Sequence, residues 1–281
     1  MKPVILGVSG PVLTPQERSL LCEHKPRGVI LFARNISNRD QVIDLNADLK
    51  NILPPGAVLM VDQEGGRVAR LKPPHWPALP PAGSLHKEEE AFAHGRALGA
   101  MVREAGFTCT AAPVLDIRVP GASDVVGDRA ITGDAATVAR LGGEIARGIM
   151  AEDVLPVMKH LPGHGRALVD SHIALPHVPE LTEDDLLPFS VNKNLPWAMT
   201  AHVVYEQYDA VNPGTLSEIV IRKLIRERIG FQGVLVSDDL AMGALSGTPA
   251  ERATRALAAG CDIALYCPGD FEGNRAVLEA L

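Results

Sequence analysis

The chain is short of aromatic side chains and lacks any excess of positive charge. Phe, Trp and Tyr make up 4% of its 281 residues, whereas 46% of the residues are hydrophobic. Such a composition is typical of a soluble protein with a large aliphatic core. The formal net charge of −7 argues against nucleic acid or an anionic membrane as the main partner.

Cysteine pairs and long apolar runs are missing as well. Four cysteines, at positions 22, 109, 261 and 267, form no C-x-x-C motif, so we expect reduced side chains in a cytoplasmic protein. No apolar run approaches the roughly 20 residues of a membrane span. The apolar N-terminal stretch is interrupted by Gly7 and Pro11 and lacks a small-residue cleavage site, which predicts a first strand rather than a signal peptide.

What the chain does contain is a regular alternation of β-rich runs and helical patterns. The predicted strands are 4–9, 28–32, 58–61, 108–114, 154–158, 198–203, 233–237 and 261–266. The predicted helices are 15–23, 39–52, 88–105, 136–151, 183–191, 217–228, 249–259 and 273–281. Ser37 and Thr182 are expected as N-caps, and Pro15 and Pro249 as first-turn residues.

Eight strands, each followed by a helix, predict an α/β fold: a single (β/α)8 TIM barrel spanning residues 1–281. The competing fold is an open, doubly wound sheet. A glycine-rich phosphate fingerprint after the first strand would favour that sheet, but GVSGPVL is not G-x-G-x-x-G.

The stretch richest in chemistry is KHLPGHGRALVDSHIALP, residues 159–176. It follows an apolar run and holds Lys159, His160, His164, Asp170 and His172 among glycines and prolines. A loop at the end of a rigid strand that carries so many titratable groups is typical of an active site. A solvated polar loop is the simpler alternative, but Lys159 and His160 come directly off the strand.

Other polar residues follow the neighbouring predicted strands. In a barrel the carboxyl ends of all strands meet at one face, where active sites lie. The residues expected there are Asp62, Glu64, Arg67, Arg70, Asp116, Arg118, Asp124, Asp128, Arg129, His202, Tyr205, Asp238 and Asp239. Carboxylates with Arg, Lys and His suit a polyhydroxylated substrate that is held by charge-assisted hydrogen bonds.

Two of these groups suggest glycoside chemistry. A carboxylate at a strand end can attack an anomeric carbon. In the Asp170-x-His172 pair, the carboxylate can orient an imidazole that exchanges protons at neutral pH. A surface salt link is the alternative interpretation of that pair.

Four segments carry a resemblance to a known family. GVLVSDDLA closely resembles the nucleophile signature of family 3 glycoside hydrolases. KHLPGHGRALVDSH, VDQEGGRVARL and MTAHVVY resemble segments of that family's bacterial β-N-acetylglucosaminidases, the enzymes of peptidoglycan recycling. The resemblance implies a cytoplasmic barrel enzyme that removes terminal N-acetylglucosamine with retention of configuration. It implies no cofactor or metal and a small muropeptide-type saccharide as the only partner, and we expect a monomer.

The resemblance also implies roles for individual residues. Asp238 is expected as the nucleophile, His172 as the acid/base and Asp170 as its partner. The expected sugar-binding residues are Asp62, Arg70, Arg129, Lys159 and His160. His164, Arg166 and His202 receive no role. Leu161, the centre of the 166–168 loop and Ala241 depart from the family pattern, and the chain ends within the expected eighth helix, which leaves barrel closure to be tested.

Three other functions remain open. His160, His164, His172, His202 and Asp62 could form the metal site of a barrel hydrolase, although no H-x-H or H-E-x-x-H spacing is present. The glycosyl-enzyme could instead pass its sugar to phosphate, since a histidine repels an anion less than a carboxylate does. A non-catalytic saccharide-binding barrel is the third alternative, and Asp238 with the Asp170/His172 pair argues against it.

The loop after the fifth strand is expected to move. Gly163 and Gly165 predict a hinge near its start, and Pro176 predicts a stiff end. We expect His172 to be carried over the bound sugar by this loop.

Overall fold

Eight parallel strands pair into a closed barrel in the order β1-β10-β9-β7-β5-β4-β3-β2 in a computed structural model that describes residues 1–281. The strands are β1 (Lys2–Gly7), β2 (Pro26–Leu31), β3 (Val58–Val61), β4 (Cys109–Thr110), β5 (Leu155–Leu161), β7 (Trp197–Thr200), β9 (Val234–Asp239) and β10 (Ile263–Tyr266). Parallel pairing of Val4 with Ala264 joins the first strand to the last. The predicted (β/α)8 barrel is confirmed, and it is closed.

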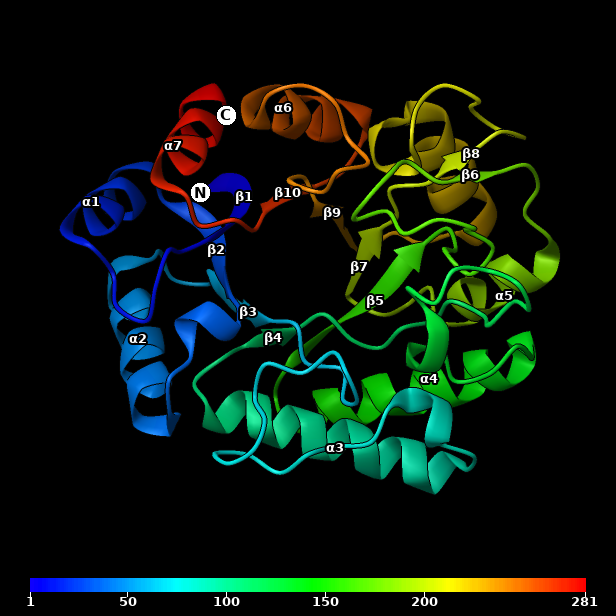
Figure 1. Cartoon of the computed structure of the whole chain (residues 1–281), viewed down its shortest axis with the longest axis horizontal. Coiled ribbons are helices and arrows are strands. Elements are labelled where there is room, and N and C mark those ends of the chain that lie inside the picture. The colour runs from blue at the N-terminus through cyan, green and yellow to red at the C-terminus, as the bar shows by residue number, and fades with distance from the viewer.

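A helix follows every strand and lies outside the barrel (Figure 1). The helices are α1 (Pro15–His24), α2 (Arg39–Ile52), α3 (Glu88–Glu104), α4 (Ala135–Met150), α5 (Glu183–Val191), the π-type helix η5 (Val220–Ile229), α6 (Pro249–Ala259) and α7 (Phe271–Ala280). Short 3-10 turns are η1 (Ala33–Asn35), η2 (Ala82–Ser84), η3 (Gly127–Arg129) and η4 (Gly214–Leu216). Outside the barrel sheet, β6 (His177–Val178) and β8 (Val204–Tyr205) pair as a separate two-stranded sheet, drawn at the upper right of Figure 1.

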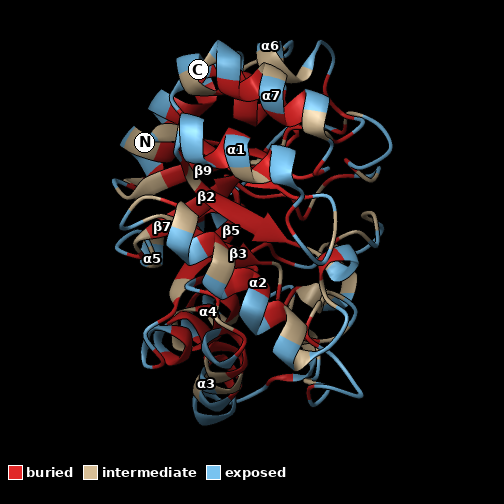
Figure 2. Ribbon diagram, turned by 90° about the vertical axis from the view of Figure 1, so that its left-hand side faces the viewer, coloured by how far each residue is buried: buried red, intermediate tan, exposed pale blue.

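Alternate residues of the strands build two apolar layers. Ile5, Met60, Val157 and Val236 belong to a 13-residue cluster inside the barrel. Their neighbours, such as Val4, belong to the larger cluster between strands and helices. Figure 2 shows the consequence, since the strands are mostly buried and the helices are buried only on their inner sides. The period of two along each strand produces both layers.

Helix starts follow the expected capping chemistry in all but one case. Pro15 and Pro249 occupy the first turns of α1 and α6. Thr182 caps α5, because its backbone N–H and its hydroxyl both donate to the Asp185 carboxylate at 2.8 Å. The prediction for Ser37 is wrong: the N-cap of α2 is Asn38, whose Oδ1 accepts the Gln41 N–H at 3.0 Å.

Strand ends differ from the predicted ones where the site begins. β5 continues through Leu161, because the carbonyl of Lys159 accepts the Leu115 N–H at 2.8 Å. β9 likewise includes Asp238 and Asp239. The regular part of β4 is only two residues long, and Pro113 just beyond it has no N–H for the ladder. No helix is both long enough and apolar enough to cross a bilayer.

Candidate active site

Many of the residues expected at the strand ends converge on one pocket at the carboxyl face of the barrel. Its lining includes Asp62, Arg70, Arg129, Lys159, His160, His172 and Asp238. Asp170 does not line the pocket but contacts His172. The residues to which the family resemblance gives a role therefore lie at this pocket or next to a residue that lines it, whereas Arg118, Asp124 and Asp128 line a separate hollow.

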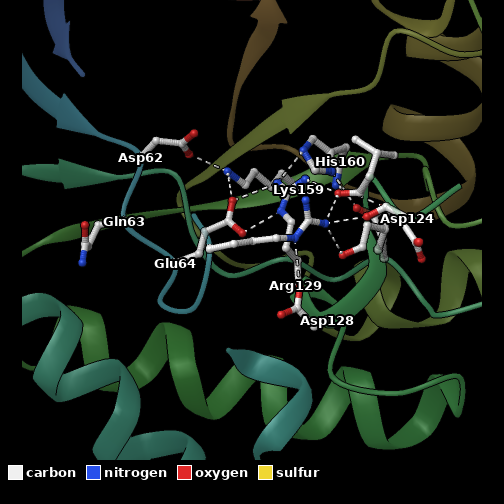
Figure 3. A network of polar contacts seen from close by, with 12 residues as sticks. Asp62, Gln63, Glu64, Asp124, Asp128, Arg129, Lys159 and His160 are labelled. Carbon is white, nitrogen blue, oxygen red and sulfur yellow. Dashed lines mark hydrogen bonds and ion pairs between the residues drawn. The ribbon is translucent and has the colours of Figure 1, made fainter. Parts of the chain in front are cut away.

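Lys159 lies at the centre of a buried charged cluster (Figure 3). Its Nζ is 2.7 Å from Asp62 Oδ1 and 2.6 Å from Glu64 Oε1, and its side chain is 3% exposed. Burial alone would lower the pKa of Lys159, but Asp62 and Glu64 raise it above its ordinary value. Lys159 is thus a fixed cation at the carboxyl end of β5.

Arg129 and Arg70 complete the cluster. Arg129 is bidentate on Glu64, with Nε–Oε2 and Nη2–Oε1 distances of 2.8 Å. Arg70 Nη2 lies 3.1 Å from Asp62 Oδ2. Burial would raise the pKa of Asp62, but Lys159 and Arg70 hold it well below its ordinary value. All five groups therefore carry charge at neutral pH.

The exposed fraction of each side chain shows which charged groups can contact a ligand and which only hold other charged groups in place. Asp62 and Arg70 keep 22% and 24% of their side chains exposed, whereas Glu64 keeps 6%. The two exposed groups can exchange hydrogen bonds with sugar hydroxyls. Glu64 holds Lys159 and Arg129 from behind.

Glu64 was expected at this face of the barrel but without a role, although it follows the same strand as Asp62. Residues two apart point to the same side of an extended chain. Gln63 points away from the cluster in Figure 3 and instead accepts the Arg70 N–H at 2.8 Å. The spacing Asp62-x-Glu64 was the available signal.

Asp116 is a second buried carboxylate that the sequence placed at the barrel mouth without a role. Its Oδ2 is 2.6 Å from His160 Nδ1, and its Oδ1 accepts the His164 N–H at 2.7 Å. His160 Nδ1–H therefore donates to Asp116, which leaves Nε2 to accept from Arg129 Nη2 at 3.5 Å. Burial would raise the pKa of Asp116, but His160 lowers it below its ordinary value. Asp116 fixes the orientation of the His160 ring.

Asp238 and Asp239 both border the pocket, but the Asp238 carboxylate accepts a single hydrogen bond, from the Asp239 N–H at 2.8 Å. Burial would raise the pKa of Asp238, yet nearby positive charge, including that of Lys159, and the Asp239 N–H lower it below its ordinary value. Asp239 Oδ1 instead accepts the N–H groups of Ala241 and Cys267 at 3.0 and 3.1 Å. Asp238 is the carboxylate that is available for chemistry.

His172 lines the same pocket as Asp238. Its Nδ1 lies 2.7 Å from Asp170 Oδ1, which also accepts the His172 backbone N–H at 2.9 Å. Burial would raise the pKa of Asp170, but these hydrogen bonds lower it below its ordinary value. An ionised Asp170 keeps the proton on Nδ1 and leaves Nε2 of a 63% exposed ring to exchange protons.

The hinge expected at Gly163 and Gly165 does not fit the packing there. The Gly163 carbonyl accepts the buried Tyr205 hydroxyl at 2.9 Å. A Cβ atom added to Gly165 would lie only 2.1 Å from the Ile117 carbonyl oxygen. Arg166 Nε is held at 2.6 Å from Asp185 Oδ2. The glycines permit close packing here and do not supply a hinge.

The part of the loop beyond Ala167 is far less enclosed. Leu168 is 71% exposed and Ile173 is 79% exposed, on either side of the Asp170/His172 pair. His164 Nε2 contacts Ser171 Oγ at 3.0 Å, which ties this outer part to the buried stem. Any movement of His172 is therefore expected in residues 168–175.

The alternative of a metal site receives no support from the geometry. No three His, Cys, Asp or Glu side chains come together in an arrangement that could hold a metal ion. His160 and His202 instead pair with Asp116 and Thr215. The five residues of that alternative do not form one coordination sphere.

Comparison with known proteins agrees with this arrangement. Residues 8–281 match the glycosyl hydrolase family 3 N terminal domain. The beta-hexosaminidase of Nitrosospira multiformis is 38% identical over 282 residues, which are 94% of this chain and 80% of that protein. The beta-hexosaminidase of Pseudomonas aeruginosa PAO1 is 38% identical over 274 residues, 94% of this chain and 82% of that protein.

Solved structures show the same barrel. NagZ from Neisseria gonorrhoeae, in complex with N-trifluoroacetyl-D-glucosamine, has a TM-score of 0.90 at 32% identity. The superposition covers 100% of this chain and 85% of the NagZ chain. A family 3 beta-N-acetylglucosaminidase from Paenibacillus has a TM-score of 0.92 at 35% identity. The superposition covers 99% of this chain and 56% of the Paenibacillus chain. With its barrel, its strand-end carboxylates and these relatives in agreement, the chain belongs to glycoside hydrolase family 3.

Proposed function

We propose that this enzyme is a retaining exo-β-N-acetylglucosaminidase that removes terminal, non-reducing N-acetylglucosamine from muropeptide-type saccharides. The observation that carries the proposal is the shared pocket, in which Asp238 and His172 border the space that Asp62 and Arg70 also face. A nucleophile, a proton donor and sugar-binding charges are the groups that a retaining glycosidase needs. The relatives named above support the N-acetylhexosamine part of the proposal.

In the first step an Asp238 oxygen attacks the anomeric carbon and forms a glycosyl ester. The bond from that carbon to the leaving-group oxygen breaks, and protonated His172 gives its Nε2 proton to this oxygen. Asp170 stabilises the imidazolium before the transfer. The paired charges around Lys159 hold the sugar ring while this happens.

In the second step water releases the sugar. The water oxygen attacks the anomeric carbon while neutral His172 Nε2 takes a proton from the water. The bond between the anomeric carbon and the Asp238 oxygen breaks. Two inversions at the same carbon return the β configuration. Asp238 regains its charge and His172 its proton, so the site is ready for another substrate.

The test is release of p-nitrophenol from p-nitrophenyl N-acetyl-β-glucosaminide, with and without EDTA. We expect turnover that EDTA leaves unchanged and that gives free N-acetylglucosamine. Loss of activity with EDTA would favour the metal-dependent alternative, and absence of turnover in both arms would contradict the proposal. Sugar 1-phosphate appearing in phosphate buffer would assign the enzyme to the phosphorylase alternative.

A further inference from the structure

Behind the pocket, three buried side chains connect the backbone N–H of the nucleophile Asp238 with the carbonyl of the next residue, Asp239. Thr200 Oγ1 accepts the Asp238 N–H at 3.2 Å. Thr200 Oγ1 and Thr215 Oγ1 are 2.7 Å apart, and Thr215 Oγ1 is 2.7 Å from His202 Nδ1. His202 Nε2 lies 2.9 Å from the Asp239 carbonyl oxygen.

One arrangement of protons satisfies this chain, with the Thr215 hydroxyl proton shared between His202 Nδ1 and the Ala201 carbonyl oxygen, which lies 3.1 Å from Thr215 Oγ1. The Asp239 carbonyl can only accept, so His202 must carry its proton on Nε2. Nδ1 of neutral His202 then accepts from the Thr215 hydroxyl. Thr215 has no second proton, so the Thr200 hydroxyl donates to it, and Thr200 is left to accept from the Asp238 N–H. Burial lowers the pKa of His202, which agrees with a neutral ring.

The three side chains come from places that the barrel already holds rigid. Thr200 is the last residue of β7, and Thr215 lies in η4. Thr200, His202 and Thr215 are each 0% exposed. None of them lines the pocket, so they act on substrate only through the residues they hold.

We propose that Thr200, Thr215 and His202 are positioning residues that set the orientation of Asp238 for attack on the sugar. This inference rests on the proposed role of Asp238 as nucleophile. One end of the chain holds the peptide N–H of Asp238 and the other holds the next carbonyl along β9. The Asp238 backbone therefore cannot rotate without breaking a buried hydrogen bond, which is costly inside a protein.

The test separates attack from sugar binding. Covalent trapping by a 5-fluoro N-acetylglucosaminyl fluoride reports the attack step, and inhibition by N-acetylglucosamine reports binding. Thr215→Val keeps the shape of the side chain and removes the hydroxyl, which leaves His202 Nδ1 and the Thr200 hydroxyl without partners. We expect trapping to slow by about 10- to 100-fold, since small misplacements of a reacting group have effects of this size. The inhibition constant of N-acetylglucosamine should change less than twofold.

Rescue and control variants guard against general damage. Thr215→Ser restores the hydroxyl and should bring trapping to within threefold of the unmodified enzyme. Thr108→Val removes a hydroxyl that accepts the Leu59 N–H at 2.9 Å near the amino end of β4, and it should leave trapping unchanged. If Thr215→Val folds poorly, the pair Thr200→Val and Thr200→Ser breaks and restores the same chain at its next link.

Trapping of Thr215→Val at the normal rate would overturn the inference, as would equal losses in the Val and Ser variants. Parallel weakening of N-acetylglucosamine binding would also overturn it, because the change would then be a general one. Failure of the proposed function looks different: the unmodified enzyme would not be trapped on Asp238 at all.

Discussion

At the scale of single residues, the neighbouring side chains Asp238 and Asp239 are of the same type but make different contacts. The Asp238 carboxylate borders the pocket and accepts only the Asp239 N–H, whereas the Asp239 carboxylate accepts the N–H groups of both Ala241 and Cys267. Both border the pocket, so side-chain alternation alone does not exclude Asp239. Their hydrogen bonds distinguish them.

Exchange of each aspartate should give a different result. We expect Asp238→Ala to lower kcat by at least 10⁴-fold, roughly the effect of removing a covalent nucleophile. Asp239→Ala should leave a folded enzyme with measurable activity, because the loss affects loop packing. Steady-state rates with circular dichroism as a folding check decide this, and greater damage from Asp239→Ala would reverse the assignment.

His172 should matter in proportion to the basicity of the leaving group. A phenolate departs with little protonation, whereas a sugar alkoxide needs a proton from His172. We expect His172→Ala to reduce hydrolysis of a disaccharide by about 10³-fold and the glycosylation rate of a nitrophenyl substrate far less. Equal losses on both substrates would contradict the role of His172 as acid in the first step.

How much the sequence reveals at this scale depends on whether a residue acts alone or through others. Asp238, Asp170 and His172 lie in short motifs with local spacing, so the sequence alone already predicts them as candidates. Glu64 and Asp116 act by holding Lys159 and His160, which come from other strands. Such partners are set by the closure of the barrel and could not be paired from the sequence.

At the scale of elements, all eight predicted strands and eight predicted helices are present, although several ends differ and the strand predicted at 108–114 keeps only Cys109–Thr110. The loop after β5 differs from the prediction of a hinge at its glycines. Glycine has backbone freedom in isolation, but Gly163 and Gly165 are enclosed by Tyr205 and Ile117. Tertiary packing removes the freedom that the sequence alone suggests.

This packing predicts that the inner part of the loop, around His164, is less mobile than the outer part, residues 168–174. The His164 amide donates to the buried Asp116 carboxylate, while the His172 amide donates only within the exposed segment. We expect the 168–174 amides to exchange hydrogen at least 10-fold faster than that of His164. Exchange measured by NMR, with and without N-acetylglucosamine, checks this, and equal protection of both parts would argue against a moving outer segment.

At the scale of the whole molecule, barrel closure buries histidines as well as carboxylates. Burial, and then the neighbouring His160, lowers the pKa of His164 to about 4 from an ordinary value of 6.5. Burial also lowers the pKa of His94 and His202. In the unfolded chain these rings take up protons at a higher pH than in the folded one.

Stability should therefore fall as the solution becomes acidic. Between pH 6.5 and 4 the unfolded state binds more protons than the native state, so the free energy of unfolding decreases as pH falls. His164 alone should contribute about 2 kcal/mol of loss between pH 7 and 5. Urea unfolding at both values checks this. His164→Gln should flatten the dependence while exposed His86→Gln should not, and an unchanged slope in His164→Gln would contradict the assignment.

The identity of the nucleophile is the central claim, and covalent trapping tests it most directly. After brief reaction with the 5-fluoro sugar, the enzyme is denatured at low pH, digested with trypsin and sequenced by tandem mass spectrometry. We predict one added sugar on peptide 229–252, located on Asp238 and absent in Asp238→Ala. A sugar on Asp239, or rapid turnover with no labelled peptide, would contradict the account.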